Sequence, residues 1–336
     1  MNNTLTDAIG GYFPLETALI SQTLYSDAQC FSSARAAFYA LLKKGQPSAL
    51  WMPRWICNAM LSPAETLGIP VRFYSLDAAF APADDLQPEN GDWVLAVNYF
   101  GLVNNLAQSL MERFNPQQIV WDHSQAFFSA PQPGLATIYS PRKFFGVPDG
   151  GMLAGEIQVD IPPTGESGSL QRTEHLLIRL AQGAEAGYTA YRQAEQTLEE
   201  LPGEGMSMLT HRLLAGIDYQ ACEQRRLENY QYLYQRLACI NALNLPARPE
   251  CGPLCYPLLT ENENLREALR QRRIFIPVYW LDALQRVSVD SIEHRYIRHI
   301  LPLPVDHRYG LDEMQSLADF VIAYLSYTGE GSDEKN

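Results

Sequence analysis

The stretch that decides the fold is residues 120–153, "VWDHSQAFFSAPQPGLATIYSPRKFFGVPDGGML". One apolar run ends in Asp122, and a second is followed by Lys143, close to a Pro-Asp-Gly-Gly turn. An ionised group at a half-buried position is costly unless another group pairs with it. Few other charges lie nearby in the sequence, so a bound cofactor is a candidate partner for both residues.

Short apolar runs alternate with helical patterns on both sides of this stretch. We expect strands at 49–53, 71–76, 92–100, 118–122, 135–140 and 150–156, and helices at 32–45, 55–68 and 104–114. The alternation predicts a largely parallel sheet with helices on both faces, which is a three-layer α/β/α domain. Ligands of such sheets bind at the carboxyl ends of the strands, where Asp122 and Lys143 stand.

The second half of the chain predicts a different organisation. After a polar break at 156–168 come helical regions at 169–200 and 206–241, strands at 254–259 and 274–280, a helix at 262–273 and an apolar segment at 301–325. We therefore expect a large α/β domain over 1–244, a smaller C-terminal α+β lobe over 245–327 and a flexible tail over 328–336.

The composition excludes several classes of protein. With 46% hydrophobic and 19% charged residues and no apolar run of about 18 residues, the chain is typical of a soluble globular protein without a membrane span. A formal net charge of −13 argues against nucleic-acid binding. The start lacks the features of a secretory signal, and six scattered cysteines are typical of reduced thiols, so we expect the cytoplasm. Cys251 and Cys255 lack a second ligand pair at zinc spacing, and we predict no metal.

Lys143 is the strongest candidate for a catalytic role. A lysine attacks carbonyl groups when its neutral form is accessible, although a lysine in a loop is more often a solvated surface residue. Asp122 is placed to hold a protonated ring nitrogen, and its alternative role is that of a helix cap or turn residue. Gln125 has an amide that can donate to an oxygen of the same ligand, and Ser124 is small enough to let a flat ring approach.

A third element is the "SSAR" segment at 32–35. The N–H groups at a helix start and the helix dipole favour phosphate, and the hydroxyls of Ser32 and Ser33 and the charge of Arg35 add to this. A plain helix N-cap is the alternative. A phosphate cup, an acid for a ring nitrogen and a lysine thus follow one another within one α/β domain.

That order is found in pyridoxal phosphate (PLP) enzymes of fold type I, and the segments resemble the DegT-type aminotransferases in particular. "VWDHSQAF" is similar to their "EDAAQAH" segment, and "YSPRKFFGVPDGGML" to their "PTKNLG…GDGGA" segment with the cofactor lysine. "SSARAAFYAL", "WMPRWICNAM" and "VNYFG" resemble their "SGTAALHLAL", "VPSFTFVAT" and "VHLYG" segments. The similarity covers roughly residues 30 to 325.

Carried over position by position, the resemblance assigns roles to four residues. It implies that Lys143 holds the cofactor as an internal aldimine and that Asp122 pairs with the pyridine nitrogen. Gln125 is implied to contact the ring hydroxyl, and Ser124 falls on the small residue beneath the ring. The implied fold is the fold-type I PLP transferase fold, a three-layer α/β/α large domain with a smaller C-terminal α+β lobe.

The phosphate contacts depart from the family. Ala34 and Arg35 fall on the Gly-Thr pair that contacts phosphate, next to Ser33, so the cup is implied to be kept through the backbone without the threonine hydroxyl. The serine that usually lies five positions before the lysine is Ile138, although Ser140 lies three before it.

The ring-stacking position also departs from the family. The aromatic residue that usually stacks on the ring is Cys57 here, while Trp55 lies two residues earlier and His123 follows the key acid. Each of the three is a candidate to cover the ring face. The "NYRM" segment, whose asparagine reaches the partner subunit's cofactor in the family, appears only as "GEGMS" at 203–207.

The resemblance implies a PLP-dependent aminotransferase, acting as a homodimer, that moves an amino group from glutamate or glutamine to a keto-sugar nucleotide in polysaccharide biosynthesis. The alternatives are a non-catalytic or regulatory protein that keeps the fold, a PLP enzyme acting on a non-sugar substrate, and a sugar dehydratase, although those relatives replace the lysine by histidine. A dinucleotide-binding dehydrogenase is the weakest, because no G-x-G-x-x-G follows the first strand. Further pocket candidates are Arg54, Arg142, His211, Arg212 and Tyr279.

Overall fold

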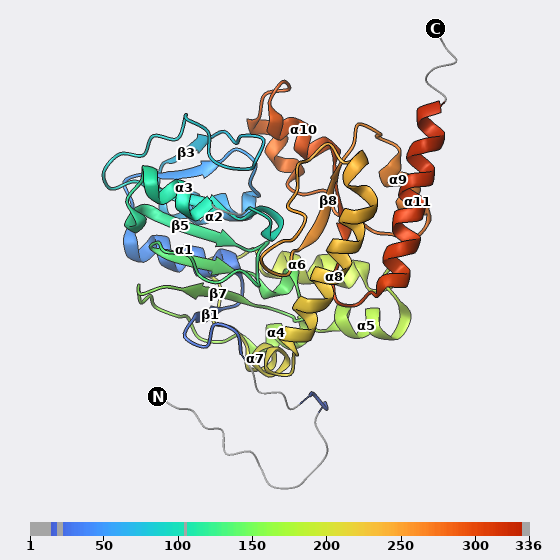
Figure 1. Ribbon diagram of the computed structural model, residues 1–336. Coiled ribbons are helices and arrows are strands. Elements are labelled where there is room, and N and C mark those ends of the chain that lie inside the picture. The colour runs from blue at the N-terminus through green and yellow to red at the C-terminus, as the bar shows by residue number, and fades with distance from the viewer. Residues whose placement is uncertain (1–14, 19–22, 104–105, 331–336) are drawn as a thin grey trace.

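The computed structural model describes residues 15–18, 23–103 and 106–330, and its centre is a seven-stranded sheet (Figure 1). The strands run across the sheet in the order β1 (Gln29–Phe31), β7 (Gly151–Ala154), β6 (Ala136–Tyr139), β5 (Ile119–His123), β4 (Trp93–Val97), β2 (Leu50–Pro53) and β3 (Val71–Tyr74). All six strands expected in this half of the chain are present. The short β1 was not expected, because its three residues are too few to show a period.

The sheet is largely parallel, as predicted, with one exception. Strands β3, β2, β4, β5 and β6 pair in parallel. Strand β7 runs antiparallel to both β6 and β1. A glycine-rich turn at 146–150 sends the chain back along β6, so β7 returns to the edge where β6 began.

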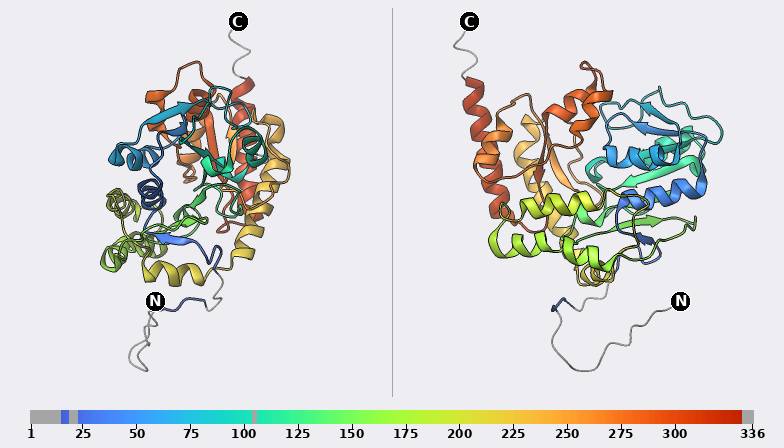
Figure 2. Two further views of the ribbon diagram at one scale, coloured as in Figure 1. Left: turned by 90° about the vertical axis from the view of Figure 1, so that its left-hand side faces the viewer. Right: turned by 180° about the vertical axis from the view of Figure 1, so that it is seen from behind.

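Helices cover both faces of the sheet. In the left view of Figure 2, α1 (Ala34–Gly45) and α2 (Asn58–Leu67) lie on one side and α3 (Leu106–Arg113) lies on the other. Every residue of β4, β5, β6 and β7 is buried as a result. This explains why these strands are continuous apolar runs instead of alternating polar and apolar residues.

The two helical regions expected after the sheet are confirmed. They consist of α4 (Glu166–Arg172), α5 (Glu174–Gln182), α6 (Tyr188–Thr197), α7 (Met208–Ala215) and α8 (Tyr219–Leu237). Helix α8 packs against β8 and α11 of the C-terminal lobe, and Arg226 on α8 donates to the carbonyl of Phe144, just after Lys143. This helix therefore connects the lobe to the candidate site.

The C-terminal lobe is built on a two-stranded antiparallel sheet of β8 (Cys255–Leu259) and β9 (Ile300–Pro304). Its helices are α9 (Leu265–Gln271), α10 (Ile292–His299) and α11 (Leu311–Glu330). The division of the chain at residue 244 stays a prediction. Residues 328–330, expected in the tail, belong to α11, and residues 331–336 lie outside the described residues.

The prediction of a strand at 274–280 is wrong. These residues form no strand, and the carbonyl of Pro277 accepts a hydrogen bond from a side chain, that of Arg266, at 2.8 Å. A proline in the middle of the segment has no N–H to donate to a ladder. The segment then turns at Trp280, which has φ 57°, into the 3-10 helix Leu281–Arg286.

Across the described parts of the chain, no helix combines the length and the apolar character that crossing a lipid bilayer requires.

Candidate active site

Asp122 and Lys143 lie at the same edge of the sheet. Strands β5 and β6 are parallel, with Asp122 opposite Ile138, so both strands end on the same side. Asp122 is the last residue but one of β5 and is 1% exposed. Lys143 closes the short 3-10 helix Pro141–Lys143 that follows β6, and its side chain is exposed.

Ser124 connects the acid to the lysine. Its backbone N–H donates to Oδ1 of Asp122 at 2.8 Å, and its hydroxyl accepts a hydrogen bond from Nζ of Lys143 at 3.0 Å. An aspartate that accepts from the N–H two residues later forms a tight local turn. The turn fixes the carboxylate, the hydroxyl and the amine relative to one another.

Gln125 lies next to this group and is 0% exposed. Its Oε1 accepts a hydrogen bond from the backbone N–H of Phe100 at 3.0 Å, while its Nε2 has no hydrogen-bond partner. Phe100 has φ 60°, which bulky residues rarely adopt, so Gln125 holds a strained turn just after β4. A buried amide with unused donors costs free energy, which an acceptor on a bound ligand would recover.

The two charges at this edge have no ionic partner among the residues that the structure describes. No cationic side chain forms an ion pair with Asp122, and no carboxylate forms one with Lys143. Asp122 is therefore a buried carboxylate with one side-chain hydrogen bond, to the Ser124 N–H. Such a group is destabilising until a cation is placed beside it.

The start of α1 lies beside β7 at the edge of this region. Ser33 is its N-cap, and the Ser33 hydroxyl accepts a hydrogen bond from the backbone N–H of Ala36 at 3.1 Å. A Cβ on Gly151 would lie 2.1 Å from the carbonyl carbon of Ser33 and 2.3 Å from the nitrogen of Ala34. Only a glycine lets the strand pass so close. The Nε of Arg35, in the first helical turn, is buried without a hydrogen-bond partner.

Two further arginines lie near this helix start. Arg142, the residue before Lys143, pairs with Glu195 on α6. Burial lowers the pKa of Arg142 to about 10; Tyr191 and Asp149 oppose this shift, and Arg172 and Arg35 add to it. Arg172 lies 3.7 Å from carboxylates of both Asp149 and Glu204. Arg142 and Arg172 are therefore paired with carboxylates, and Arg35 is the one of these three arginines with no ion pair among the described residues.

The segment at 203–207 packs against the same helix start. The backbone N–H of Glu204 donates to the hydroxyl of Ser32 at 3.1 Å, and the N–H of Ser32 donates to the carbonyl of Glu204 at 2.8 Å. The N–H of Ser207 donates to Asp149 at 3.2 Å. The segment is thus tied by hydrogen bonds to the residue before the N-cap of α1 and to Asp149.

The three candidates for a ring-covering residue lie in different surroundings. Trp55 is 1% exposed and is stacked on Tyr99, with ring centres 4.9 Å apart. Cys57 is the half-buried N-cap of α2; burial raises the pKa of its thiol, Lys143 opposes this shift and Asp122 adds to it. Cys57 is thus close to both charged residues but has no ring.

His123 lies away from Asp122, because successive residues of a strand face opposite sides. Its imidazole contacts Tyr139 edge-on at 5.4 Å and lines a hollow together with Asn98, Ser129 and Cys251. Burial lowers the pKa of His123 to about 4, so the imidazole is neutral at pH 7. The structure does not bring His123 to the face that carries the acid.

One aromatic residue near Lys143 was missed by the sequence reasoning. The ring centre of Trp280 lies 6.0 Å from Nζ of Lys143. The residue falls at the end of the segment that was expected to be a strand, so the sequence pattern assigned it to a sheet of the C-terminal lobe. No local signal in the sequence places it beside residue 143.

The remaining pocket candidates are spread over the molecule. Ser140 is buried and caps the 3-10 helix that ends in Lys143. Arg54 donates to the carbonyl of Arg286 at 3.4 Å. Tyr279 packs against Phe100 with ring centres 6.0 Å apart. The last two, His211 and Arg212, lie on α7.

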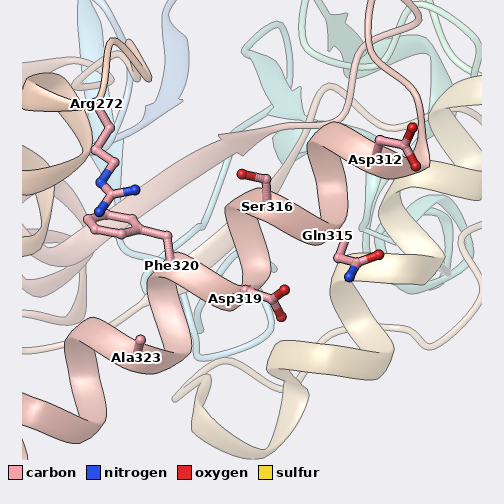
Figure 3. Close-up of a pocket in the computed structure, with 7 residues that line it drawn as sticks. All are labelled: Arg272, Asp312, Gln315, Ser316, Asp319, Phe320 and Ala323. Carbon is pink, nitrogen blue, oxygen red and sulfur yellow. The ribbon is translucent and has the colours of Figure 1, made fainter.

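A surface hollow on the C-terminal lobe is separate from this site. Figure 3 shows it along α11, with Arg272 over the ring of Phe320 and with Asp312 and Asp319 at its sides. Asp319 is also paired with Arg236. None of these residues belongs to the Asp122–Lys143 group. In the described residues no cluster of three or more histidine, cysteine or acidic side chains is suited to hold a metal.

Comparison with known proteins gives matches at the level of structure. No protein-family model matches the chain, and no curated protein matches it. The fold is similar to that of the sugar aminotransferase CalS13 from Micromonospora echinospora, with a TM-score of 0.58, 13% identity and coverage of 88% of this chain and 86% of that one.

Two more structural neighbours are an aminotransferase and a dehydratase. A DegT DnrJ EryC1 StrS aminotransferase from Brucella abortus has a TM-score of 0.59 at 14% identity, covering 88% of this chain and 85% of that chain. GDP-4-keto-6-deoxymannose-3-dehydratase, solved with GDP-perosamine, has a TM-score of 0.60 at 15% identity, covering 87% of each chain. A neighbour from Streptococcus pneumoniae is solved in apo, PLP and PMP forms. The predicted fold class is thereby confirmed: this chain shares the three-layer fold of these aminotransferases and of the dehydratase.

Proposed function

We propose that this protein is a PLP-dependent aminotransferase. The observation that carries the proposal is the group of Asp122, Ser124 and Lys143, joined by hydrogen bonds of 2.8 and 3.0 Å at the carboxyl edge of the sheet, with the buried Gln125 next to it. In an open α/β sheet this edge is where ligands bind. The aminotransferases among the structural neighbours support the same conclusion.

The unsatisfied groups of the site fit PLP. The buried carboxylate of Asp122 lacks a cation, and a protonated pyridine nitrogen supplies one. The Nε2 of Gln125 lacks an acceptor, and the phenolic oxygen of the ring supplies one. Arg35, at the start of α1, has no ion-pair partner among the described residues, so a phosphate there gains a charge-assisted hydrogen bond.

The side chains of the site then have separable roles. When bound, PLP supplies an electron sink for negative charge on the carbon next to the transferred amine. Asp122 keeps the ring nitrogen protonated. Lys143 would hold the cofactor at its aldehyde carbon, and its Nζ would take up the proton that leaves the substrate carbon. Ser124 holds that nitrogen in place through its hydroxyl, 3.0 Å away.

The presence of a lysine at position 143 favours amino transfer over dehydration. The structural neighbours include both a sugar aminotransferase and GDP-4-keto-6-deoxymannose-3-dehydratase, so the fold alone does not decide between the two reactions. An amine at position 143 can both form the link to PLP and move the proton, whereas an imidazole cannot form that link. The residue present therefore favours amino transfer.

We further propose glutamate or glutamine as the amino donor and a keto-sugar linked to a nucleoside diphosphate as the acceptor. The sugar is supported by the structural neighbours, which include a sugar aminotransferase and a dehydratase solved with GDP-perosamine. The direct experiment is to add PLP to the purified protein, record its visible absorbance, and follow the loss of that absorbance with each amino donor. A protein that never takes up PLP would overturn the enzyme proposal and favour a non-catalytic binding protein.

Arg35 provides a test of the phosphate site. We expect Arg35→Gln to weaken PLP binding about tenfold while leaving the binding of pyridoxal, which lacks the phosphate, unchanged. Lys43→Gln, at the other end of the same helix, is the matched control and is expected to change neither affinity. Equal losses for PLP and pyridoxal would assign Arg35 to the fold and not to the phosphate.

We also propose that the protein is a homodimer. Helices α4, α5 and α6 carry apolar side chains that are exposed in the single chain, among them Leu170, Leu177, Leu180 and Tyr188. These three helices contact one another, and large exposed apolar side chains on neighbouring helices are candidates for an interface. We expect sedimentation velocity at micromolar protein to give the mass of two chains. Monomers alone at that concentration would contradict the proposal.

A further inference from the structure

Trp280 reaches the candidate site from the C-terminal lobe. The ring centre of its indole lies 6.0 Å from Nζ of Lys143, and the side chain is 9% exposed. Trp280 is the N-cap of the 3-10 helix Leu281–Arg286, whereas Lys143 follows β6 of the central sheet. The aromatic ring beside the lysine amine therefore comes from a part of the chain that is 137 residues later in the sequence (280 − 143).

The position of Trp280 is fixed by its backbone and its neighbours. Its φ of 57° and ψ of 49° are rare for a bulky side chain and persist only where the surrounding contacts hold them. The indole packs edge-on against Trp55 at 5.4 Å and against Tyr99 at 5.7 Å. Tyr99 in turn donates its hydroxyl to the carbonyl of Trp55 at 2.7 Å. These contacts hold the indole beside Lys143.

The other candidates for the ring-covering residue either pack against other parts of the molecule or have no aromatic ring. The indole of Trp55 is stacked on Tyr99 within 10° of parallel and is enclosed by Phe80 and Tyr296. His123 lines the hollow on the opposite side of the strand. Cys57 has no ring. Among the described side chains, Trp280 has the one aromatic ring for which a contact with Lys143 is observed.

We propose that Trp280 is the aromatic residue that packs on the bound cofactor ring and closes this site from the C-terminal lobe. The inference rests on the proposed function. An electron-rich indole is suited to a cationic pyridine ring, because stacking and cation–π attraction act together. The ring that position 57 lacks is thus supplied by another element of the fold.

Two variants of Trp280 test this role. We expect Trp280→Leu to weaken PLP binding about tenfold and to shift the absorption maximum of the bound cofactor, because the aromatic face is lost. Trp280→Phe keeps a ring and is expected to bind PLP within about threefold of the parent. It should, however, lose only part of the quenching of tryptophan fluorescence that accompanies PLP binding, because the indole of Trp55, 5.4 Å from that of Trp280 in the parent, remains.

The controls separate this role from a structural one. Trp51, which donates to Asp92 and packs on Arg72 away from the site, is the matched control, and Trp51→Phe should keep the quenching. Thermal unfolding of each variant without PLP reports the stability of the fold alone. If the parent takes up PLP and Trp280→Leu binds it with the same affinity and the same absorption maximum, the inference about Trp280 is wrong. If the parent takes up no PLP, the proposed function itself fails.

Discussion

Lys143→Ala is expected to lower the rate of amino transfer at least about 10⁴-fold, because one side chain both binds the cofactor and moves the proton. The fold should survive, since the lysine is exposed and makes one side-chain hydrogen bond, to Ser124. Borohydride should attach the cofactor covalently to the parent at the peptide that contains residue 143 and leave the variant unlabelled. Peptide mass mapping and circular dichroism measure the two effects.

Lys43→Ala is the control for this experiment. Lys43 lies in the last turn of α1 and is exposed, so its loss should leave both labelling and activity unchanged. Lys143→Arg adds a second comparison, because it keeps the positive charge but not an amine that can form the covalent link. If Lys143→Ala transferred amino groups as fast as the parent, Lys143 would be a surface residue and the enzyme proposal would fall.

The sequence predicted the sheet well because burial on both faces leaves a strong local signal. Strands β4, β5 and β6 are continuous apolar runs bounded by polar turns, and all were expected. The antiparallel direction of β7 was not expected, because direction depends on how the chain returns after the turn at 146–150 and not on the residues of the strand. The apolar pattern is the same for both directions.

The segment 274–280 shows where local patterns mislead. Its apolar and β-branched residues are typical of a strand, yet Pro277 interrupts the ladder and no neighbouring strand is available within the described residues. Because this segment was predicted to be a strand, Trp280 was not recognised as a residue of the candidate site. A residue whose importance depends on a contact between two lobes carries no periodic signal of its own, so only the folded arrangement places it next to Lys143.

The part of the candidate site that follows from the order of the strands could be predicted from the sequence. Asp122, Ser124 and Gln125 are neighbours in sequence at the end of one strand, and Lys143 follows the adjacent parallel strand, so strand order alone brings them together. The network around Arg142 involves long-range partners such as Glu195 and could not be read from spacing.

Asp122→Asn is expected to change the stability of the cofactor-free protein and the activity of the loaded protein in opposite directions. Asparagine keeps the oxygen that accepts from the N–H of Ser124 but removes a buried charge without an ionic partner among the described residues. The free energy of unfolding without PLP should therefore rise by about 1 kcal/mol. Amino transfer should fall about 10²–10³-fold, because the ring nitrogen loses the carboxylate that stabilises its protonated form.

Asp149→Asn is the matched control for the sign of this effect. Asp149 is also 1% exposed, but it lies 3.7 Å from the guanidinium of Arg172, so the same substitution there breaks a buried ion pair. The cofactor-free protein should then lose about 3 kcal/mol of stability. Urea unfolding of both variants, with and without PLP, measures the difference. PLP should stabilise Asp122→Asn less than it stabilises the parent, because the cation it brings no longer meets a carboxylate. A loss of stability in cofactor-free Asp122→Asn as large as that of Asp149→Asn would make Asp122 a structural turn residue, because a carboxylate kept for the ligand stabilises the fold only when the ligand is bound.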